Sequence, residues 1–108
     1  MKHKIYYSVE SRRDLNGIWD YIASELQNAS AAERIVTGIL DSVQQLEDFA
    51  ELGAPLSSIV DVEGGFRFLV VGNYLAFYRI ENGEVYIDRI LYGRRDYLRI
   101  LFGKTTSE

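Results

Sequence analysis

The sequence predicts an α+β domain: an N-terminal strand, a helical hairpin packed on an antiparallel sheet of three or four strands, and a short C-terminal helix. Three observations support this fold class. Two stretches in the first half repeat apolar residues every three or four positions, which is typical of amphipathic helices. The second half alternates apolar with polar residues, which is typical of half-buried strands. Gly-Gly, Gly-Asn and Asn-Gly pairs interrupt that second half and predict tight turns between consecutive strands.

The first expected strand covers residues 4–9, where apolar residues recur at every second position. A helix follows with Ser11 as its N-cap, because Asp14 stands three residues later in the capping-box position. This helix is expected to end near residues 27–28. Its apolar stripe consists of Leu15, Ile18, Trp19, Ile22 and Leu26.

The second expected helix begins with a complete capping box, in which Ser30 is followed by Glu33. Its apolar face consists of Ala32, Val36, Ile39, Val43, Leu46 and Ala50. Because only a few polar residues separate the two helices, we expect them to form an antiparallel hairpin. Gly38 lies inside the second helix, either where the two helices approach closely or as a tolerated surface residue.

A glycine and the only proline of the chain, within residues 51–55, end this helix. The strands expected after it cover residues 58–62, 66–71, 74–81 and 84–92. A short helix is then expected at residues 94–102, with Gly103 beyond its C-terminal end. The predicted domain therefore spans residues 1–103, and residues 104–108 form a frayed tail.

Residues 72–73 and 82–83 are expected to form two-residue hairpin loops, which would fix the register of the sheet. The expected pairs are Val71 with Tyr74 and Glu81 with Glu84. One face then carries the more apolar set, which we assign to the helical hairpin: Phe66, Phe68, Val70, Leu75, Phe77 and Ile90. The other face is the candidate working surface: Arg67, Leu69, Tyr74, Ala76, Tyr78, Ile87, Arg89 and Leu91. A slip of one residue in either turn would exchange these sets.

The composition argues against several function classes. The chain of 108 residues has no cysteine and one histidine, so we expect no metal site, no cofactor and no His-centred triad. Its net charge is −4, divided into −6 for residues 1–66 (5 Lys+Arg, 11 Asp+Glu) and +2 for residues 67–108 (7 against 5). This division suits a protein that binds proteins better than a general nucleic-acid binder. No apolar run reaches the roughly 20 residues of a membrane span, and no signal peptide opens the chain, so a cytoplasmic location is expected.

The densest positive charge lies just after the last strand, at Arg94 and Arg95. Their guanidinium groups could bind phosphate or carboxylate, with Asp96 orienting one of them. Alternatively, this run is a solvated helix start at which Asp96 acts as a cap. Tyr92 and Tyr97 could serve as proton donors nearby, or Tyr97 could pack its helix against the sheet.

Arginines and tyrosines also gather on the candidate working surface, at Arg67, Tyr74, Tyr78 and Arg89. Such a cluster could stack on RNA bases and neutralise phosphates, or it could receive an acidic or aromatic segment of a protein partner. The alternative is ordinary cross-strand packing with the arginine heads in solvent.

The order of elements and four sequence motifs resemble the RelE/ParE superfamily of toxins from bacterial type II toxin–antitoxin modules. The resemblance covers nearly the whole chain. The motifs are Asp14-Leu15 with Ile18 and Tyr21-Ile22, residues 46–53, residues 66–70 with 73–79, and residues 89–96. The long helical hairpin and the Gly-Arg-Arg-Asp ending look more like ParE-type members, which are associated with plasmid stabilisation and with inhibition of DNA gyrase. RelE-type members are mRNA interferases that act at the ribosome.

This resemblance implies a toxin that is neutralised by a cognate antitoxin, as a homodimer or as a heterotetramer with it. The residues implied for target binding are Arg94, Arg95, Asp96 and Tyr97. Those implied for antitoxin binding are Leu69, Tyr74, Tyr78, Ile87, Arg89 and Leu91, of which Leu69, Ile87 and Leu91 are expected to be exposed. Coverage by a folding antitoxin segment is the expected mode of binding.

Two alternatives remain open. As an endoribonuclease, the chain would use Arg95, Arg67 and Arg89 on the scissile phosphate, with Tyr92 or Tyr97 assisting proton transfer. Tyr74 stands where such ribonucleases have a strand arginine, and Leu101 stands in place of a terminal tyrosine. Many relatives also carry histidine where this chain has Tyr92. These departures favour the gyrase-directed interpretation. The third interpretation is an inactive homologue that is retained for antitoxin binding.

Overall fold

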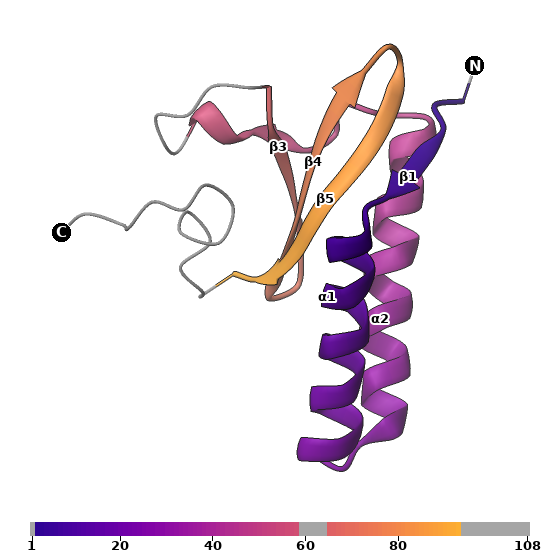
Figure 1. The fold of residues 1–108 in the computed structure, drawn as a ribbon, viewed down its shortest axis with the longest axis vertical. Helices are drawn as coiled ribbons and strands as arrows, with labels where there is room; N and C mark the ends of the chain where they lie inside the picture. The colour runs from indigo at the N-terminus through magenta and orange to yellow at the C-terminus, as the bar shows by residue number, and fades with distance from the viewer. Residues whose placement is uncertain (1, 59–64, 94–108) are drawn as a thin grey trace, which may run out of the picture.

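The computed structural model describes residues 2–58 and 65–93, and it arranges them as a helical hairpin against one face of a twisted five-stranded sheet (Figure 1). The strands are β1 (Ile5–Tyr7), β2 (Ala54–Pro55), β3 (Arg67–Val71), β4 (Tyr74–Glu81) and β5 (Glu84–Tyr92), in the spatial order β1-β5-β4-β3-β2. β1 runs parallel to β5, and the other neighbours are antiparallel. The α+β fold with its N-terminal strand and helical hairpin is therefore as predicted.

The first helix, α1, covers Val9–Asp20 and continues as one wider π-helical turn, η1, at Tyr21–Glu25. Its N-cap is Ser8, because the Ser8 hydroxyl oxygen accepts a hydrogen bond from the backbone N–H of Ser11 at 2.9 Å. The prediction of Ser11 as the N-cap is wrong. Ser11 lies fully buried in the first turn, where its hydroxyl donates to the Ser8 carbonyl.

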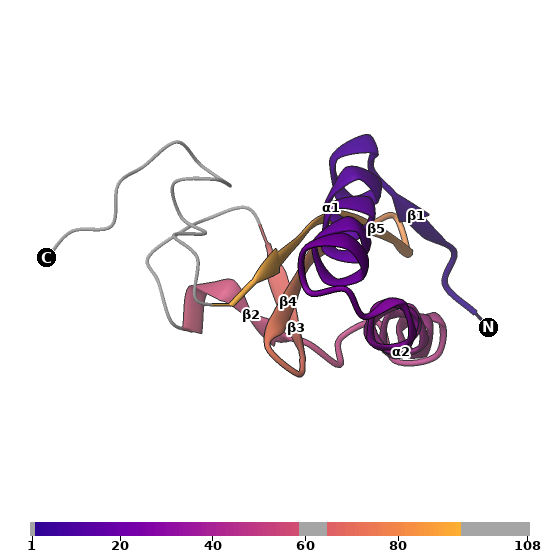
Figure 2. The ribbon, with the colours of Figure 1, turned by 90° about the horizontal axis from the view of Figure 1, so that it is seen from below.

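The second helix, α2, covers Ala29–Gln44 and ends in a single 3₁₀ turn at Gln45–Glu47. Asn28, rather than the predicted Ser30, is its N-cap, and the Asn28 side chain accepts from the backbone N–H of Ala31 at 3.0 Å. Figure 2 shows α1 and α2 side by side on the same side of the sheet. Of the two interpretations of Gly38, the surface one is confirmed, because a Cβ added there would meet nothing within 4 Å.

Both hairpin loops have the predicted register, with Val71 opposite Tyr74 and Glu81 opposite Glu84. The assignment of the two sheet faces is wrong. The helices cover the face that was predicted as the working surface, and the core consists of Ile39, Val43, Leu46, Ala50, Ala76, Tyr78, Val85, Ile87 and Ile90. On the opposite face, Leu56 packs with Phe77 and Leu91. Because both faces bury apolar residues, apolar content does not reveal which of them the helices cover.

A β-bulge in β5 changes the facing of its last residues. Tyr78 pairs with Ile87, but Phe77 pairs with Arg89, so Asp88 is an extra residue in the strand. Beyond the bulge, Ile90 joins the helix-side core and Leu91 joins the opposite cluster. An unbroken alternation had grouped Ile90 with Phe77 and Leu91 with Tyr78, so the bulge exchanges these two residues between the predicted sets.

The chain between α2 and β3 differs from the predicted strand at residues 58–62. Ala54–Pro55 forms β2, and Leu56–Ser58 forms a 3₁₀ turn, while residues 59–62 lie outside the described residues. The helix predicted at residues 94–102 and the tail beyond it lie outside them as well. In the two described stretches, no helix has the length and apolar character needed to cross a membrane.

Candidate functional site

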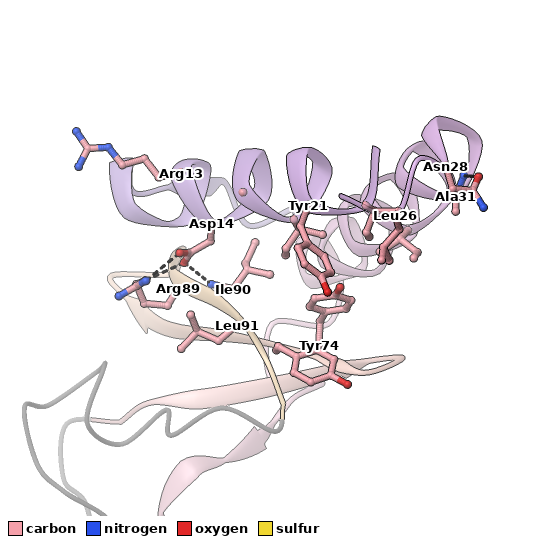
Figure 3. Close-up of a pocket in the computed structure, with 15 residues that line it drawn as sticks. Arg13, Asp14, Tyr21, Leu26, Asn28, Ala31, Tyr74, Arg89, Ile90 and Leu91 are labelled. Atoms are coloured by element: carbon pink, nitrogen blue, oxygen red, sulfur yellow. Dashed lines mark hydrogen bonds and ion pairs between the residues drawn. The ribbon is translucent and has the colours of Figure 1, made fainter. Parts of the chain in front are cut away.

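An open groove of about 1010 Å³ lies between the helical hairpin and the end of the sheet that carries the β3–β4 loop (Figure 3). The apolar part of its helical wall comes from Gly17, Ile18, Ile22, Leu26, Ala31 and Ile35, and Arg13, Asp14, Tyr21 and Asn28 complete that wall. Its sheet wall comes from Tyr74 at the start of β4 and from Ile90, Leu91 and Tyr92 at the end of β5. The groove therefore joins segments that lie far apart in the sequence.

The π-helical turn shapes the upper wall of this groove. Within it, Ile22 is buried, whereas the neighbouring Tyr21 is 57% exposed. Figure 3 shows the Tyr21 side chain directed from the helix towards Tyr74 on the sheet. Single π-helical turns inserted into α-helices are frequent at functional sites.

Three tyrosines meet at the groove. The rings of Tyr74 and Tyr92 are edge-to-face with their centroids 5.6 Å apart. Burial raises the pKa of Tyr74, and the negative charges that Tyr92 and Tyr21 would acquire on ionising raise it further. None of the three hydroxyl groups has a hydrogen-bond partner within residues 2–58 and 65–93. The cluster thus presents aromatic area and free hydroxyl groups together, a combination that is common at binding surfaces.

Arg89 is held by Asp14 of α1 rather than being free for a ligand. The guanidinium Nε and Nη2 each donate to the Asp14 carboxylate at 2.8 Å. The hydrogen bond with Asp14 is the main reason that the pKa of Arg89 is raised. The two side chains are 26% and 12% exposed, so this paired contact is largely shielded from water. At the same wall, Arg13 has no ion-pair partner within the described stretches.

Arg67 and Tyr78 form a closed cluster further from the groove. The Tyr78 hydroxyl donates to the Ala50 carbonyl at 2.8 Å and accepts from the Gly53 N–H at 2.9 Å. Arg67 Nη1 donates to the carbonyls of Gly53 at 2.6 Å and of Glu51 at 3.4 Å. The predicted Arg67/Tyr74/Tyr78/Arg89 surface is therefore divided between this closed cluster and the groove.

The residues predicted for antitoxin binding are likewise divided. Tyr74, Arg89 and Leu91 line the groove. Tyr78 and Ile87 are fully buried, and Leu69 packs against the helical core. The expected exposure is wrong for Ile87 and for Leu91, which is 8% exposed, because the helices and the Leu56 turn cover the sheet from its two sides.

The predicted target-binding residues Arg94, Arg95, Asp96 and Tyr97 lie outside the described residues. Tyr92, a predicted proton donor, is 38% exposed at the groove. Sequence reasoning missed Arg13 and Tyr21, and it gave Asp14 a capping role. An exposed aromatic residue beside an apolar helical stripe was the one available signal for Tyr21.

The chemistry offered by the groove is that of recognition. Its walls combine aliphatic side chains, aromatic rings and Arg13, which has no ion-pair partner among residues 2–58 and 65–93. Across the described part of the chain, no three His, Cys, Asp or Glu side chains are grouped so that they could hold a metal ion.

Comparison with known proteins gives this fold and groove a context. The family model for the ParE toxin of the type II toxin–antitoxin system parDE matches residues 5–97. A solved structure of the chromosomal ParDE toxin–antitoxin system from P. aeruginosa is similar, with 26% identity and a TM-score of 0.70. The match covers 84% of this chain and 96% of that one. No curated protein sequence matches.

A second similar structure is the toxin–antitoxin complex RelBE2 from Mycobacterium tuberculosis, with 20% identity and a TM-score of 0.61, covering 85% of this chain and 99% of that one. At this identity the likeness concerns the fold alone. The fold and the match together define a toxin of a type II toxin–antitoxin system. Within that class, the chain belongs to the ParE toxin family.

Proposed function

We propose that this toxin arrests growth by binding DNA gyrase and that a cognate antitoxin silences it by filling the groove. The observation that carries the choice of target is that Arg67 and Arg89 are each hydrogen-bonded to other groups of the chain. Both were candidates for the phosphate contacts of a ribonuclease, and both already have partners within the chain.

The ribonuclease alternative requires cations that are free to stabilise the charge developing on the scissile phosphate. Asp14 neutralises Arg89 through two hydrogen bonds, and breaking that contact would leave a largely shielded carboxylate unpaired. Arg67 is held by two backbone carbonyls. A net charge of −4 also disfavours approach to the dense phosphates of the ribosome.

The shape and lining of the groove support the antitoxin part of the proposal. The wall runs along the helical hairpin from Arg13 to Leu26, about 20 Å at 1.5 Å per residue, which matches a helical segment of three to four turns. Apolar side chains at helical spacing would lie against Ile18, Ile22 and Leu26, as in helix-in-groove recognition. The similar structures contain toxin–antitoxin complexes, which supports a partner of this kind.

The target is tested with the purified toxin in a gyrase supercoiling assay. We expect inhibition that is lost when the cognate antitoxin is added, and at least tenfold weaker inhibition by Arg95→Ala. Failure of the wild-type toxin to inhibit gyrase at large molar excess would contradict the choice of target.

A translating ribosome system provides the second arm of the test. We expect codons in the ribosomal A site to remain intact when the toxin is added. Codon-specific cleavage would establish the ribonuclease alternative instead. Absence of growth arrest on expression without the antitoxin would establish the inactive homologue.

A further inference from the structure

We infer that Asp14 is a positioning residue that selects the bulged register of β5 and thereby sets how the chain leaves the sheet at Gly93. This role goes beyond the proposed function, and only the activity arm of its test rests on that proposal. Asp14 acts through Arg89 and Ile90, which it contacts across the gap between α1 and β5 (Figure 3).

The contacts of Asp14 are specific to the bulged register. Its Oδ2 accepts from Arg89 Nε at 2.8 Å and from the backbone N–H of Ile90 at 2.9 Å, and its Oδ1 accepts from Arg89 Nη2 at 2.8 Å. The Ile90 N–H therefore points away from β4, towards α1. Without the extra residue Asp88, alternation along the strand would turn this N–H towards β4.

The hydrogen bonds between β1 and β5 show where along β5 the backbone groups change direction. Up to the bulge, β5 directs the Val85 N–H and the Ile87 carbonyl to the β1 side, where they bond with Lys4 and Ser8. β1 ends there, and the remaining edge of β5 would lack a partner strand. Asp14 satisfies the first N–H of this edge, that of Ile90, in place of a strand.

The regular register is the alternative that Asp14 disfavours. It would place Arg89 opposite Ala76, which is 1% exposed beneath the helices, and Ile90 opposite Leu75 on the other face. Asp14 would lose its contacts at the same time, and its carboxylate is shielded enough to make that loss costly. The apolar pattern and the Asp14 contacts thus favour the same register.

The register determines the geometry of the exit from the sheet. In the bulged register Tyr92 pairs with Tyr74, and the Gly93 N–H donates to the Asn73 carbonyl at 2.7 Å. A shift of one residue would place Leu91 opposite Tyr74 and turn Tyr92 to the other face. Arg94 and Arg95, which are proposed to contact the target, follow Gly93 directly in the sequence.

The test measures the register by nuclear magnetic resonance in the full chain. In the bulged register the Hα of Ala76 lies opposite the Hα of Ile90, whereas in the regular register it lies opposite the Hα of Arg89. We expect the Ala76–Ile90 nuclear Overhauser effect in the wild type and in Asp20→Asn, a matched control at an exposed position of α1. In Asp14→Ala we expect an Ala76–Arg89 effect, together with at least tenfold weaker inhibition of gyrase.

Asp14→Asn guards against a variant that fails to fold, because its amide oxygen can still accept from Ile90. For this variant we expect amide exchange at Ile90 at least tenfold faster than in the wild type. A folded Asp14→Ala with an unchanged Ala76–Ile90 effect would overturn the inference, as would unchanged Ile90 exchange in Asp14→Asn. An inactive wild type would contradict the proposed function and leave the register measurement decisive.

Discussion

Tyr74 and Tyr78 lie on the same strand and the same face of the sheet, four residues apart, yet their environments are opposite. Tyr78 is fully buried under the helical layer, and its hydroxyl both donates and accepts a hydrogen bond. Tyr74 is only partly covered, borders an open groove and packs edge-on against Tyr92. One end of the helix-covered face is thus closed by internal hydrogen bonds, and the other end is left open between the helices and the sheet.

Within this one strand, the residue at the closed end stabilises the fold, and the residue at the open end is available for binding a partner. At the closed end the Tyr78 hydroxyl both donates and accepts a hydrogen bond, and Arg67 Nη1 donates to two backbone carbonyls, so these groups are already occupied within the chain. At the open end, aromatic area and hydroxyl groups remain available to a partner protein. Substitutions at the closed end should therefore change the free energy of unfolding, and those at the open end should change binding.

The largest effect is expected for Gly53→Ala at the closed end. A Cβ at residue 53 would lie 2.6 Å from the backbone oxygen of Phe68 and 2.8 Å from the Tyr78 ring. We expect the free energy of unfolding in urea to fall by about 3 kcal/mol. Gly38→Ala is the matched control, because its Cβ meets no neighbour and Ala should stabilise α2 by up to about 1 kcal/mol. A wild-type midpoint for Gly53→Ala would contradict the closed cluster.

Removing a single hydroxyl group compares the two ends directly. Tyr78→Phe leaves the Gly53 N–H and the Ala50 carbonyl without this partner, and we expect a loss of about 2 kcal/mol in the free energy of unfolding. Tyr74→Phe should change it by less than about 0.5 kcal/mol. Equal losses in the two variants would remove the distinction between the closed and the open end.

Binding of the antitoxin should respond at the open end. Tyr21→Ala removes an exposed ring from the groove and should weaken the complex about tenfold or more, because aromatic residues often carry much of the binding energy. Calorimetric titration with the cognate antitoxin measures this change. Tyr6→Ala serves as the control, since Tyr6 is also exposed but stacks on Tyr86 away from the groove. Equal losses for the two variants would show that the groove is not the preferred surface.

The smallest effect concerns proton binding, measured by a titration of carbon-labelled tyrosine. Burial raises the pKa of Tyr74 and that of Tyr78 above the usual 10.0. At Tyr74 the negative charge of ionised Tyr92 raises the pKa further. Tyr92→Phe should therefore lower the pKa of Tyr74 and leave that of Tyr78 unchanged. Because a raised pKa means that the unfolded chain ionises first, stability should decrease as the pH rises above about 10. An unchanged pKa at Tyr74 would contradict the tyrosine cluster.

The sequence predicted the elements that depend on local patterns. Helical periodicity revealed α1 and α2, and two-residue turn signals fixed the hairpin register. The N-caps were displaced because several Ser and Asn residues compete at each helix start, and the hydrogen bonds of the folded chain choose among them. The facing of Ile90 and Leu91 was unpredictable in a different way, since the bulge is held by Asp14, 76 residues before Ile90.

The candidate site was only partly within reach of the sequence. Strand alternation brought Tyr74 and Arg89 into one predicted set, and both do line the groove. The opposite wall could not be predicted, because a π-helical turn has no local sequence signal and is what presents Tyr21. The pairing of Arg89 with Asp14 depends on how α1 crosses β5, which only tertiary packing determines.

Hydrogen–deuterium exchange of the toxin, alone and in complex with its cognate antitoxin, tests the role of the open groove most directly. We expect slower exchange on binding at residues 21–26 and 90–92, the segments of the helical wall and of β5 that border the groove. Exchange at residues 50–53 of the closed cluster should stay unchanged. Protection confined to the opposite face of the sheet, with residues 21–26 unaffected, would contradict the assignment of the groove to the antitoxin.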